Sequence, residues 1–200
     1  MQFDQEKIKY FDDVVPSWLH QQAQDTVPYL PLKWGHRGLG PYQGHQFFSD
    51  VWKHEEIENA PWVLRAIWSS FEQHKHQIDP DVGDIQLNQI QVNLTTKDHI
   101  GGLHVDTQGD TPAYTMVYSV IGDSGMDFYN SDSELKHTVD YGDARCIVFP
   151  SAMIHQGQPP KETSPRVTVG FIFSGVASKF ARDRGVIMPI FKKEQEKIVQ

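Results

Sequence analysis

A histidine and an aspartate lie two positions apart in the stretch GGLHVDTQG, at His104 and Asp106. In an extended strand, residues i and i+2 project from the same face, so we expect the imidazole and the carboxylate side by side, with Val105 turned away. Two histidines and one carboxylate make up the facial triad that binds non-haem Fe(II). The pair supplies two of these ligands, although a surface histidine beside a turn aspartate has the same pattern.

A third ligand has to come from elsewhere in the chain, and two histidines downstream are candidates. His155 follows the apolar stretch CIVFP and a short turn, and it begins the next expected strand. His137 follows Lys136 in a polar stretch, so we expect it to be exposed. Imidazole is a common ligand of first-row metals. His155 is therefore a candidate ligand, and a packed or surface histidine is the alternative.

An arginine begins the apolar stretch RVTVGFIF further along the chain. Arg166, Thr168 and Gly170 share one face of this expected strand. A buried arginine is costly unless it is paired with an anion. A dicarboxylate would supply that anion through a bidentate contact, with Thr168 adding a hydroxyl and Gly170 leaving room. The alternative is a salt bridge to one of the chain's own acidic residues.

The elements that carry these residues are expected in two parts, helices first and strands later. The first part, 1–84, holds a short strand and two helices that begin at prolines. From residue 85 the hydrophobic pattern alternates, and the short spacers are rich in Gly, Asp, Ser and Pro, which favours a β-sandwich or barrel. We expect one domain over 1–200, mainly β with packed helices, with a core at 85–175 and a tail at 176–200. The expected helices cover 16–25 and 59–75, and the expected strands cover 8–15, 85–94, 113–121, 126–130, 136–141, 144–150, 153–158 and 166–175.

The stretch IQLNQIQVNL places Gln89, Gln91 and Asn93 on one strand face and apolar residues on the other. If the apolar face meets the helices, this polar row lines an internal pocket. Exposure of the row to solvent is the equal alternative.

The composition excludes several classes of protein. Hydrophobic residues make up 38% of the 200 residues, and 11 Phe and 5 Trp indicate a packed core. The net charge of −8 and the lack of a basic stripe argue against a nucleic-acid partner. The single cysteine, Cys146, is expected to be buried and fits a reducing compartment. With no signal-peptide pattern and no apolar run of about 18 residues, we expect a cytoplasmic protein with no membrane partner.

The order of these motifs resembles that of the Fe(II)/2-oxoglutarate-dependent oxygenases, in particular the prolyl-4-hydroxylase-like branch and its small bacterial and bacteriophage members. The resemblance spans about residues 85 to 175, and the N-terminal FDDVVPSWL also resembles the opening of that branch. It implies a double-stranded β-helix, also called a jelly roll or cupin barrel. The matching stretches are HVD, TMVYSV, GMDFY, YGDARCIVFP, IHQGQPP and RVTVGFIF.

The resemblance also implies roles for residues. His104, Asp106 and His155 would hold Fe(II), and Arg166 would bind the distal carboxylate of 2-oxoglutarate. The chain departs from the family at Ser119, where prolyl hydroxylases often carry a tyrosine, and at Gly125, where many members have a glycine pair. Further cosubstrate contacts are expected from Asn93 and Tyr118, with Thr115 and Ser119 as competitors if the register differs by one.

The implied reaction uses O2 to hydroxylate a substrate and converts 2-oxoglutarate to succinate and CO2. Asp106 favours hydroxylation, because family members that halogenate lack this carboxylate. The substrate would be a peptide or a small molecule, with peptidyl proline as the default. The aromatic, Gly- and Pro-containing segment 29–52 is expected to form a lid or substrate wall, or else to serve packing. The alternative function is a cupin-type metal-binding protein or a metalloenzyme that does not use 2-oxoglutarate.

Overall fold

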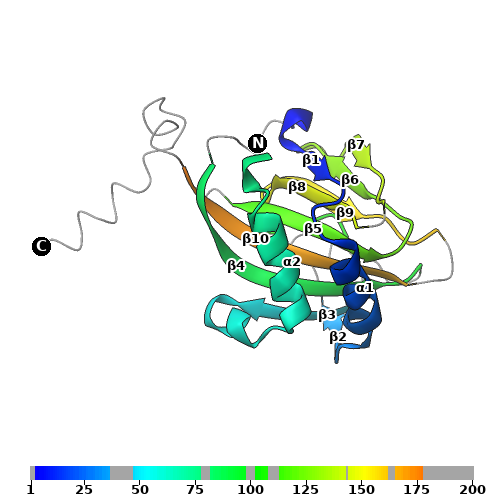
Figure 1. The fold of residues 1–200 in the computed structure, drawn as a ribbon. Helices are drawn as coiled ribbons and strands as arrows, with labels where there is room; N and C mark the ends of the chain where they lie inside the picture. The colour runs from blue at the N-terminus through cyan, green and yellow to red at the C-terminus, as the bar shows by residue number, and fades with distance from the viewer. Residues whose placement is uncertain are drawn as a thin grey trace, which may run out of the picture.

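The chain forms two antiparallel β-sheets with a layer of two helices on the outside (Figure 1). The computed structural model describes residues 3–36, 47–77, 82–97, 102–107, 113–142, 144–161 and 165–177. In spatial order, the larger sheet contains β1 (Lys9–Phe11), β8 (Cys146–Pro150), β5 (Tyr114–Ile121), β10 (Arg166–Ala177), β4 (Val82–Thr95), β3 (Phe47–Lys53) and β2 (Lys33–His36). The smaller sheet contains β7 (Leu135–Val139), β6 (Met126–Tyr129) and β9 (Ile154–Gly157), and the helices are α1 (Ser17–Thr26) and α2 (Trp62–Glu72).

Helices α1 and α2 lie side by side across one face of the larger sheet (Figure 1). Each begins directly after a proline, a residue that suits a helix start. In α2, Leu64, Ile67 and Phe71 recur at helical spacing and are buried. Burying each of these side chains contributes roughly 1.5–3 kcal/mol. The helix predicted over 59–75 is present but shorter at both ends.

The larger sheet has one apolar face and one polar face. On β4, Ile90 and Val92 are fully buried in the same core as the helices. Their neighbours Gln89, Gln91 and Asn93 are half-buried and point to the opposite side, because successive strand residues alternate. The polar row therefore lies on the face turned away from the helices, which is the side of the smaller sheet.

The strand register aligns polar residues across this inner face. Asn93 of β4 pairs with Thr168 of β10, which in turn pairs with Ser119 of β5. Arg166 lies two residues before Thr168, on the same face of β10, and pairs with Thr95. Both Thr168 and Ser119 are almost completely buried. The inner face thus offers hydroxyl and amide groups beside the arginine.

A second apolar core fills the space between the two sheets. It joins Ile147 and Phe149 of β8 to Met126 and Phe128 of β6. The rings of Phe128 and Phe149 pack edge to face, with their centroids 5.1 Å apart. This core supports β9, the strand that carries His155, because β9 pairs with β6 in the smaller sheet.

The first strand is shorter than the predicted strand over 8–15. It ends at Phe11, and Asp13 then takes a positive φ of 60°, which an extended strand does not allow. The chain is held at this turn by Arg145, whose guanidinium donates to Asp12 at 2.7 Å and 2.9 Å. Strand β1 thus serves as the edge of the larger sheet next to β8.

Two predicted segments are described only in part. Residues 37–46 of the predicted lid or wall at 29–52 lie outside the described residues, and the parts on either side contribute β2 and β3. Residues 178–200 of the predicted tail also lie outside them. No helix among the described residues is both long and apolar enough to span a membrane.

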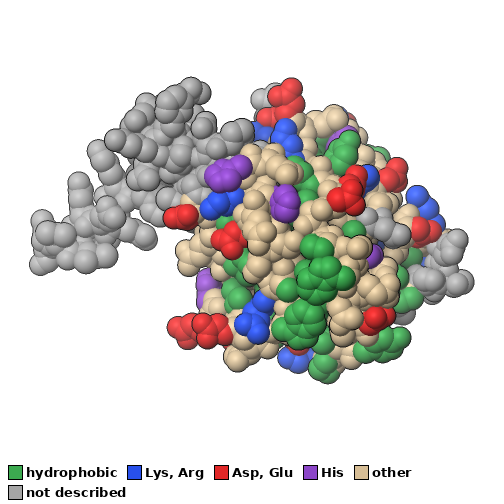
Figure 2. All heavy atoms as spheres, viewed as in Figure 1, with side chains coloured by type: hydrophobic (Ala, Val, Ile, Leu, Met, Phe, Trp, Pro, Cys, Tyr) green, Lys and Arg blue, Asp and Glu red, His purple; other side chains and the backbone are tan. Residues whose placement is uncertain are grey.

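Several large hydrophobic side chains are exposed on the outer surface. Figure 2 shows hydrophobic side chains on the face that carries the helices. Trp18 of α1 and Trp62 of α2 are 61% and 51% exposed. These tryptophans belong to the helix layer, which covers the opposite side of the larger sheet from the polar row.

Candidate metal centre and anion pocket

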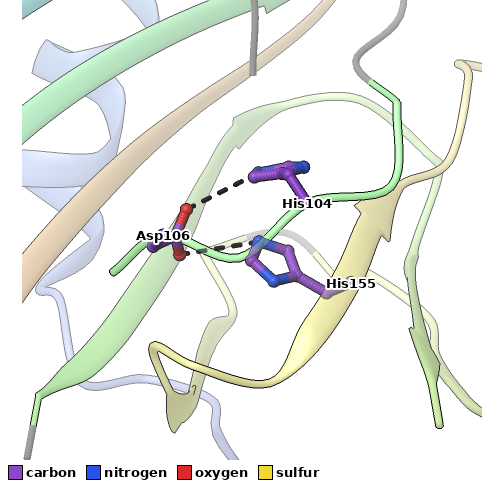
Figure 3. Close-up of side chains that lie close together, drawn as sticks. All are labelled: His104, Asp106 and His155. Carbon is purple, nitrogen blue, oxygen red and sulfur yellow. Dashed lines mark ion pairs between the residues drawn. The ribbon is translucent and has the colours of Figure 1, made fainter. Parts of the chain in front are cut away.

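The structure brings His104, Asp106 and His155 together in one cluster (Figure 3). Their possible ligand atoms all lie within 4.8 Å of one another. Nε2 of His104 is 3.5 Å from Oδ1 of Asp106, and Nε2 of His155 is 3.5 Å from Oδ2 of the same carboxylate. Two imidazole nitrogens and a carboxylate oxygen are the donor set of a 2-His-1-carboxylate iron site.

Backbone hydrogen bonds join the two segments that carry these residues. The N–H of His104 donates to the carbonyl of His155, and the N–H of His155 donates to the carbonyl of His104, both at 3.0 Å. The N–H of Asp106 donates to the carbonyl of Ser151 at 2.9 Å. His104 therefore forms an isolated bridge with His155, and Asp106 lies in a bend two residues later, rather than both lying in an extended strand.

Each imidazole is oriented by a backbone carbonyl. Nδ1 of His104 lies 2.8 Å from the carbonyl oxygen of Gly102, and Nδ1 of His155 lies 2.9 Å from that of Met153. Because a carbonyl oxygen can only accept, Nδ1 is the protonated nitrogen in both rings. Nε2 of each neutral ring then keeps its lone pair and faces Asp106, as a metal ligand requires.

A chain of two hydroxyl groups, from Thr115 and Ser151, holds the carboxylate of Asp106. Thr115 of β5 donates its hydroxyl hydrogen to Oδ2 of Asp106 at 2.6 Å. The hydroxyls of Thr115 and Ser151 are 2.9 Å apart. Since the single hydrogen of Thr115 is already used, Ser151 is the donor in that second bond. This chain of hydrogen bonds fixes the plane of the carboxylate.

The electrostatics favour the protonation states that bind a metal. Burial raises the pKa of Asp106, but the neighbouring His155 and His104 and the Thr115 hydroxyl outweigh it, so the pKa is about 2. Burial lowers the pKa of His155 to about 4, even though Asp106 opposes this shift. Burial also lowers the pKa of His104, but its bond to Asp106 leaves it raised overall. At neutral pH Asp106 is ionised and His155 is neutral, and both forms can act as ligands.

Arg166 is a buried cation that lacks an acidic partner among the described residues. Its side chain is 6% exposed, and no carboxylate pairs with it among the described residues. Nη2 donates to the hydroxyl of Tyr141 at 2.9 Å, whereas Nε has no hydrogen-bond partner in this part of the chain. The charge of Arg166 is one of the causes that lower the pKa of His155. A buried arginine of this kind fits an anionic ligand close to the histidines.

Asn93 lies on the inner face of the larger sheet, opposite Thr168 of β10. Its Oδ1 accepts hydrogen bonds from Nε2 of Gln91 at 2.7 Å and from the hydroxyl of Ser49 at 3.1 Å. With Oδ1 occupied by these two donors, the amide nitrogen of Asn93 remains as a hydrogen-bond donor on the inner face.

The structure does not bring Tyr118 to this pocket. Tyr118 points to the helix side of β5, where its hydroxyl lies 2.6 Å from Nδ1 of His20 on α1. The two residues named as competitors, Thr115 and Ser119, lie on the inner face instead. The prediction for Tyr118 is corrected by one residue of register, because a shift of one position reverses the face of a strand. His137 lies on β7 with its ring against Phe128 and is not part of the metal-binding cluster.

Sequence reasoning missed Tyr141 and Gly157 as neighbours of Arg166. Tyr141 lies between β7 and β8 and contacts Arg166, a residue far along the chain. A Cβ atom at position 157 would lie 2.5 Å from Nη1 of Arg166, so the backbone of Gly157 packs directly against the guanidinium. No local spacing signals either contact. A tyrosine and a glycine in the stretches YGDARCIVFP and IHQGQPP were the only available signs.

Solved structures of 2-oxoglutarate- and Fe(II)-dependent oxygenases share this fold. An oxidoreductase of the 2OG-Fe(II) oxygenase family from Burkholderia pseudomallei matches with a TM-score of 0.63 at 12% identity, covering 86% of this chain and 88% of that chain. The collagen prolyl hydroxylase of Paramecium Bursaria Chlorella virus-1 matches with a TM-score of 0.56 at 13% identity, covering 84% and 96%. A prolyl-4-hydroxylase of Pseudomonas putida matches with a TM-score of 0.55 at 13% identity, covering 84% and 92%.

These likenesses confirm the predicted double-stranded β-helix with packed helices. No protein-family model and no curated protein sequence matches the chain. The similarity is therefore one of fold, and the function has to be argued from the side chains of the site.

Proposed function

We propose that this protein is an Fe(II)- and 2-oxoglutarate-dependent dioxygenase that hydroxylates its substrate. The observation that carries the proposal is the pairing of two features on one side of the larger sheet. One is the His104, Asp106 and His155 cluster, and the other is a buried Arg166 that has no carboxylate partner in the part of the chain that the structure describes. The fold of the similar oxygenases supports it.

The donor atoms fit Fe(II). His104 and His155 would bind it through Nε2, and Asp106 would bind it through its carboxylate. Three protein ligands of this type leave coordination positions open for a cosubstrate and O2. When bound, Fe(II) with 2-oxoglutarate and O2 supplies the oxidation of a substrate C–H bond, with release of succinate and CO2.

The chain's own residues bind and orient the reactants. Arg166 would hold the distal carboxylate of 2-oxoglutarate by charge-assisted hydrogen bonds, and Asn93 would donate its amide hydrogens beside it. Phe149 packs against the ring of His155 with centroids 4.6 Å apart, and Phe128 lies on the same apolar core. This packing keeps water away from one side of the metal site and fixes the imidazole.

A peptide is the first substrate class to test, and peptidyl proline is the first residue within it. Prolyl hydroxylases occur among the proteins that share the fold. A panel of proline-containing peptides and small metabolites would be incubated with the protein, Fe(II), 2-oxoglutarate and O2. Mass spectrometry would then identify the substrate as the compound that gains the mass of one oxygen atom.

The proposal is tested by an anaerobic titration with Fe(II) and 2-oxoglutarate. We expect a metal-to-ligand charge-transfer band when both are present. Arg166→Ala should abolish this band while Fe(II) still binds, and Asp106→Ala should abolish Fe(II) binding itself. Arg65→Ala on the exposed side of α2 is the matched control and should behave as wild type.

The rival function makes a different prediction for the same variants. A metalloenzyme that does not use 2-oxoglutarate needs the metal cluster but gives Arg166 no role in cosubstrate binding. If Arg166→Ala bound 2-oxoglutarate as tightly as the wild type, this rival would explain the site better.

A further inference from the structure

We propose that residues 186–191 of this chain pack onto the helix layer and cover an aromatic patch on its outer surface. The patch consists of Trp18 at the start of α1, Trp62 at the start of α2 and Tyr29, which follows α1. The helix layer covers the side of the larger sheet opposite the polar row, so this inference does not depend on the proposed function.

The patch exposes three large aromatic side chains. Trp18, Tyr29 and Trp62 are 61%, 83% and 51% exposed. Figure 2 shows hydrophobic side chains gathered over α1 and the adjoining end of α2. A single exposed hydrophobic residue is ordinary, whereas a group of large ones marks a surface that binds another group. An apolar occupant is therefore expected on the helix layer.

Acidic residues dominate the charge of the helix layer. The segments 16–30 and 54–74 contain five Asp and Glu residues, against one Arg and no Lys. Glu55, Glu56 and Glu58 precede α2, are exposed, and form no ion pair within the part of the chain that the structure describes. The occupant of the patch should therefore carry basic residues beside its apolar part.

The sequence that follows β10 has this combination. Residues 182–193 read RDRGVIMPIFKK, an apolar run with two basic residues on each side. Residues 178–200 hold six basic and three acidic residues, so the rest of the chain, with 12 basic and 23 acidic residues, has a net charge of −11. The segment is thus opposite in charge to the remainder of the protein, which favours their association.

The apolar run is within reach of the patch. Strand β10 crosses the larger sheet behind both helices and ends at Ala177 (Figure 1). Its 12 residues span about 40 Å, and the 14 residues from 178 to 191 span up to about 46–50 Å when extended. Because the run is joined to the protein, its effective concentration near the patch is on the order of millimolar. This favours the chain's own segment over a second copy of the protein.

The experiment measures hydrogen–deuterium exchange of residues 186–191 in the full chain by mass spectrometry, with a synthetic peptide of residues 178–200 as the unprotected reference. We expect exchange to be at least about ten-fold slower in the full chain, because docked amides exchange only when the segment opens. Trp18→Ser/Trp62→Ser should remove this protection. Leu135→Ser is the matched control and should keep it, because Leu135 is a 55% exposed hydrophobic residue on β7 of the smaller sheet.

A second measurement detects the same contact from the helix layer without changing the residues of that layer. Hydroxyl radicals oxidise the tryptophans that water reaches, and mass spectrometry locates the oxidised residues. In Ile187→Ser/Phe191→Ser, we expect Trp18 and Trp62 to be oxidised faster than in the wild type. Trp68 is 8% exposed and should be oxidised equally in both proteins. Unchanged oxidation of Trp18 and Trp62 would contradict the contact.

Four further outcomes overturn the inference. Exchange of residues 186–191 at the rate of the free peptide would show that this segment does not cover the patch. Protection that survives Trp18→Ser/Trp62→Ser would place the segment elsewhere on the protein. Protection that falls on dilution would identify a second copy as the occupant, and protection that appears only with vesicles of anionic lipid would identify a membrane surface. None of these outcomes bears on the binding of Fe(II) or 2-oxoglutarate.

Discussion

Gly157 offers a direct way to move Arg166 without changing it. Gly157 ends β9, two residues after His155. In Gly157→Ala the new Cβ atom would lie 2.5 Å from Nη1 of Arg166 and 3.0 Å from its Cζ. An ordinary contact begins at 3.4 Å, so the guanidinium has to shift by about 0.9 Å. The backbone of Gly157 is fixed by its pairing with Met126 of β6, so the arginine is the part that moves.

A shift of this size is large compared with the tolerance of a hydrogen bond. The bond from Arg166 to Tyr141 is 2.9 Å long, and N–H···O bonds span only about 2.7–3.2 Å. Loss of one hydrogen bond to a charged group costs about 1.5–3 kcal/mol. Since about 1.4 kcal/mol corresponds to a tenfold change in affinity, we expect Gly157→Ala to weaken 2-oxoglutarate binding at least ten-fold. Fe(II) affinity should be retained.

The assay is anaerobic calorimetry of the Fe(II)-loaded protein with 2-oxoglutarate, together with thermal unfolding. Gly142→Ala is the matched control, because its Cβ would meet Arg145 at 3.6 Å, an ordinary contact. The control should bind 2-oxoglutarate as the wild type does. Wild-type affinity in a folded Gly157→Ala protein would refute the reasoning, since it would show that the position of the guanidinium is not critical.

Two further predictions concern the residues around Asp106 and the corrected register of β5. Thr115→Val removes the hydroxyl that donates to Asp106 and is expected to lower Fe(II) affinity roughly ten- to a hundred-fold, measured in competition with a chelator. The control Thr138→Val breaks a similar 2.6 Å bond to Asp127 on the surface and should leave Fe(II) affinity unchanged. Equal effects of the two variants would contradict the role of Thr115 in orienting Asp106. Tyr118→Phe removes a hydroxyl on the helix side of the sheet and is expected to lower the free energy of unfolding by about 1 kcal/mol with no change in 2-oxoglutarate affinity. A loss of that affinity, measured by calorimetry, would instead restore Tyr118 as a cosubstrate contact.

Much of the architecture follows from patterns that are local in the chain. The alternation in β4 separates Ile90 and Val92 from the amide row, and the helical spacing of Leu64, Ile67 and Phe71 defines the buried side of α2. Such patterns are readable because each depends only on the geometry of a single element. The order of the motifs HVD, IHQGQPP and RVTVGFIF, through the family that it resembles, predicted His104, Asp106, His155 and Arg166 as one site, and the structure brings the first three within 4.8 Å of one another.

The tertiary structure decided everything that depends on which strands are neighbours and in which register. It placed Thr115 rather than Tyr118 on the inner face, turned the polar row to the side of the smaller sheet, and brought Tyr141 and Gly157 to Arg166. These contacts join residues far apart in sequence, and a slip of one residue in a strand would turn the strand residues among them to the other face. No local pattern encodes such contacts, because they arise only when the strands pack and the chain brings distant segments to the same side of the sheet.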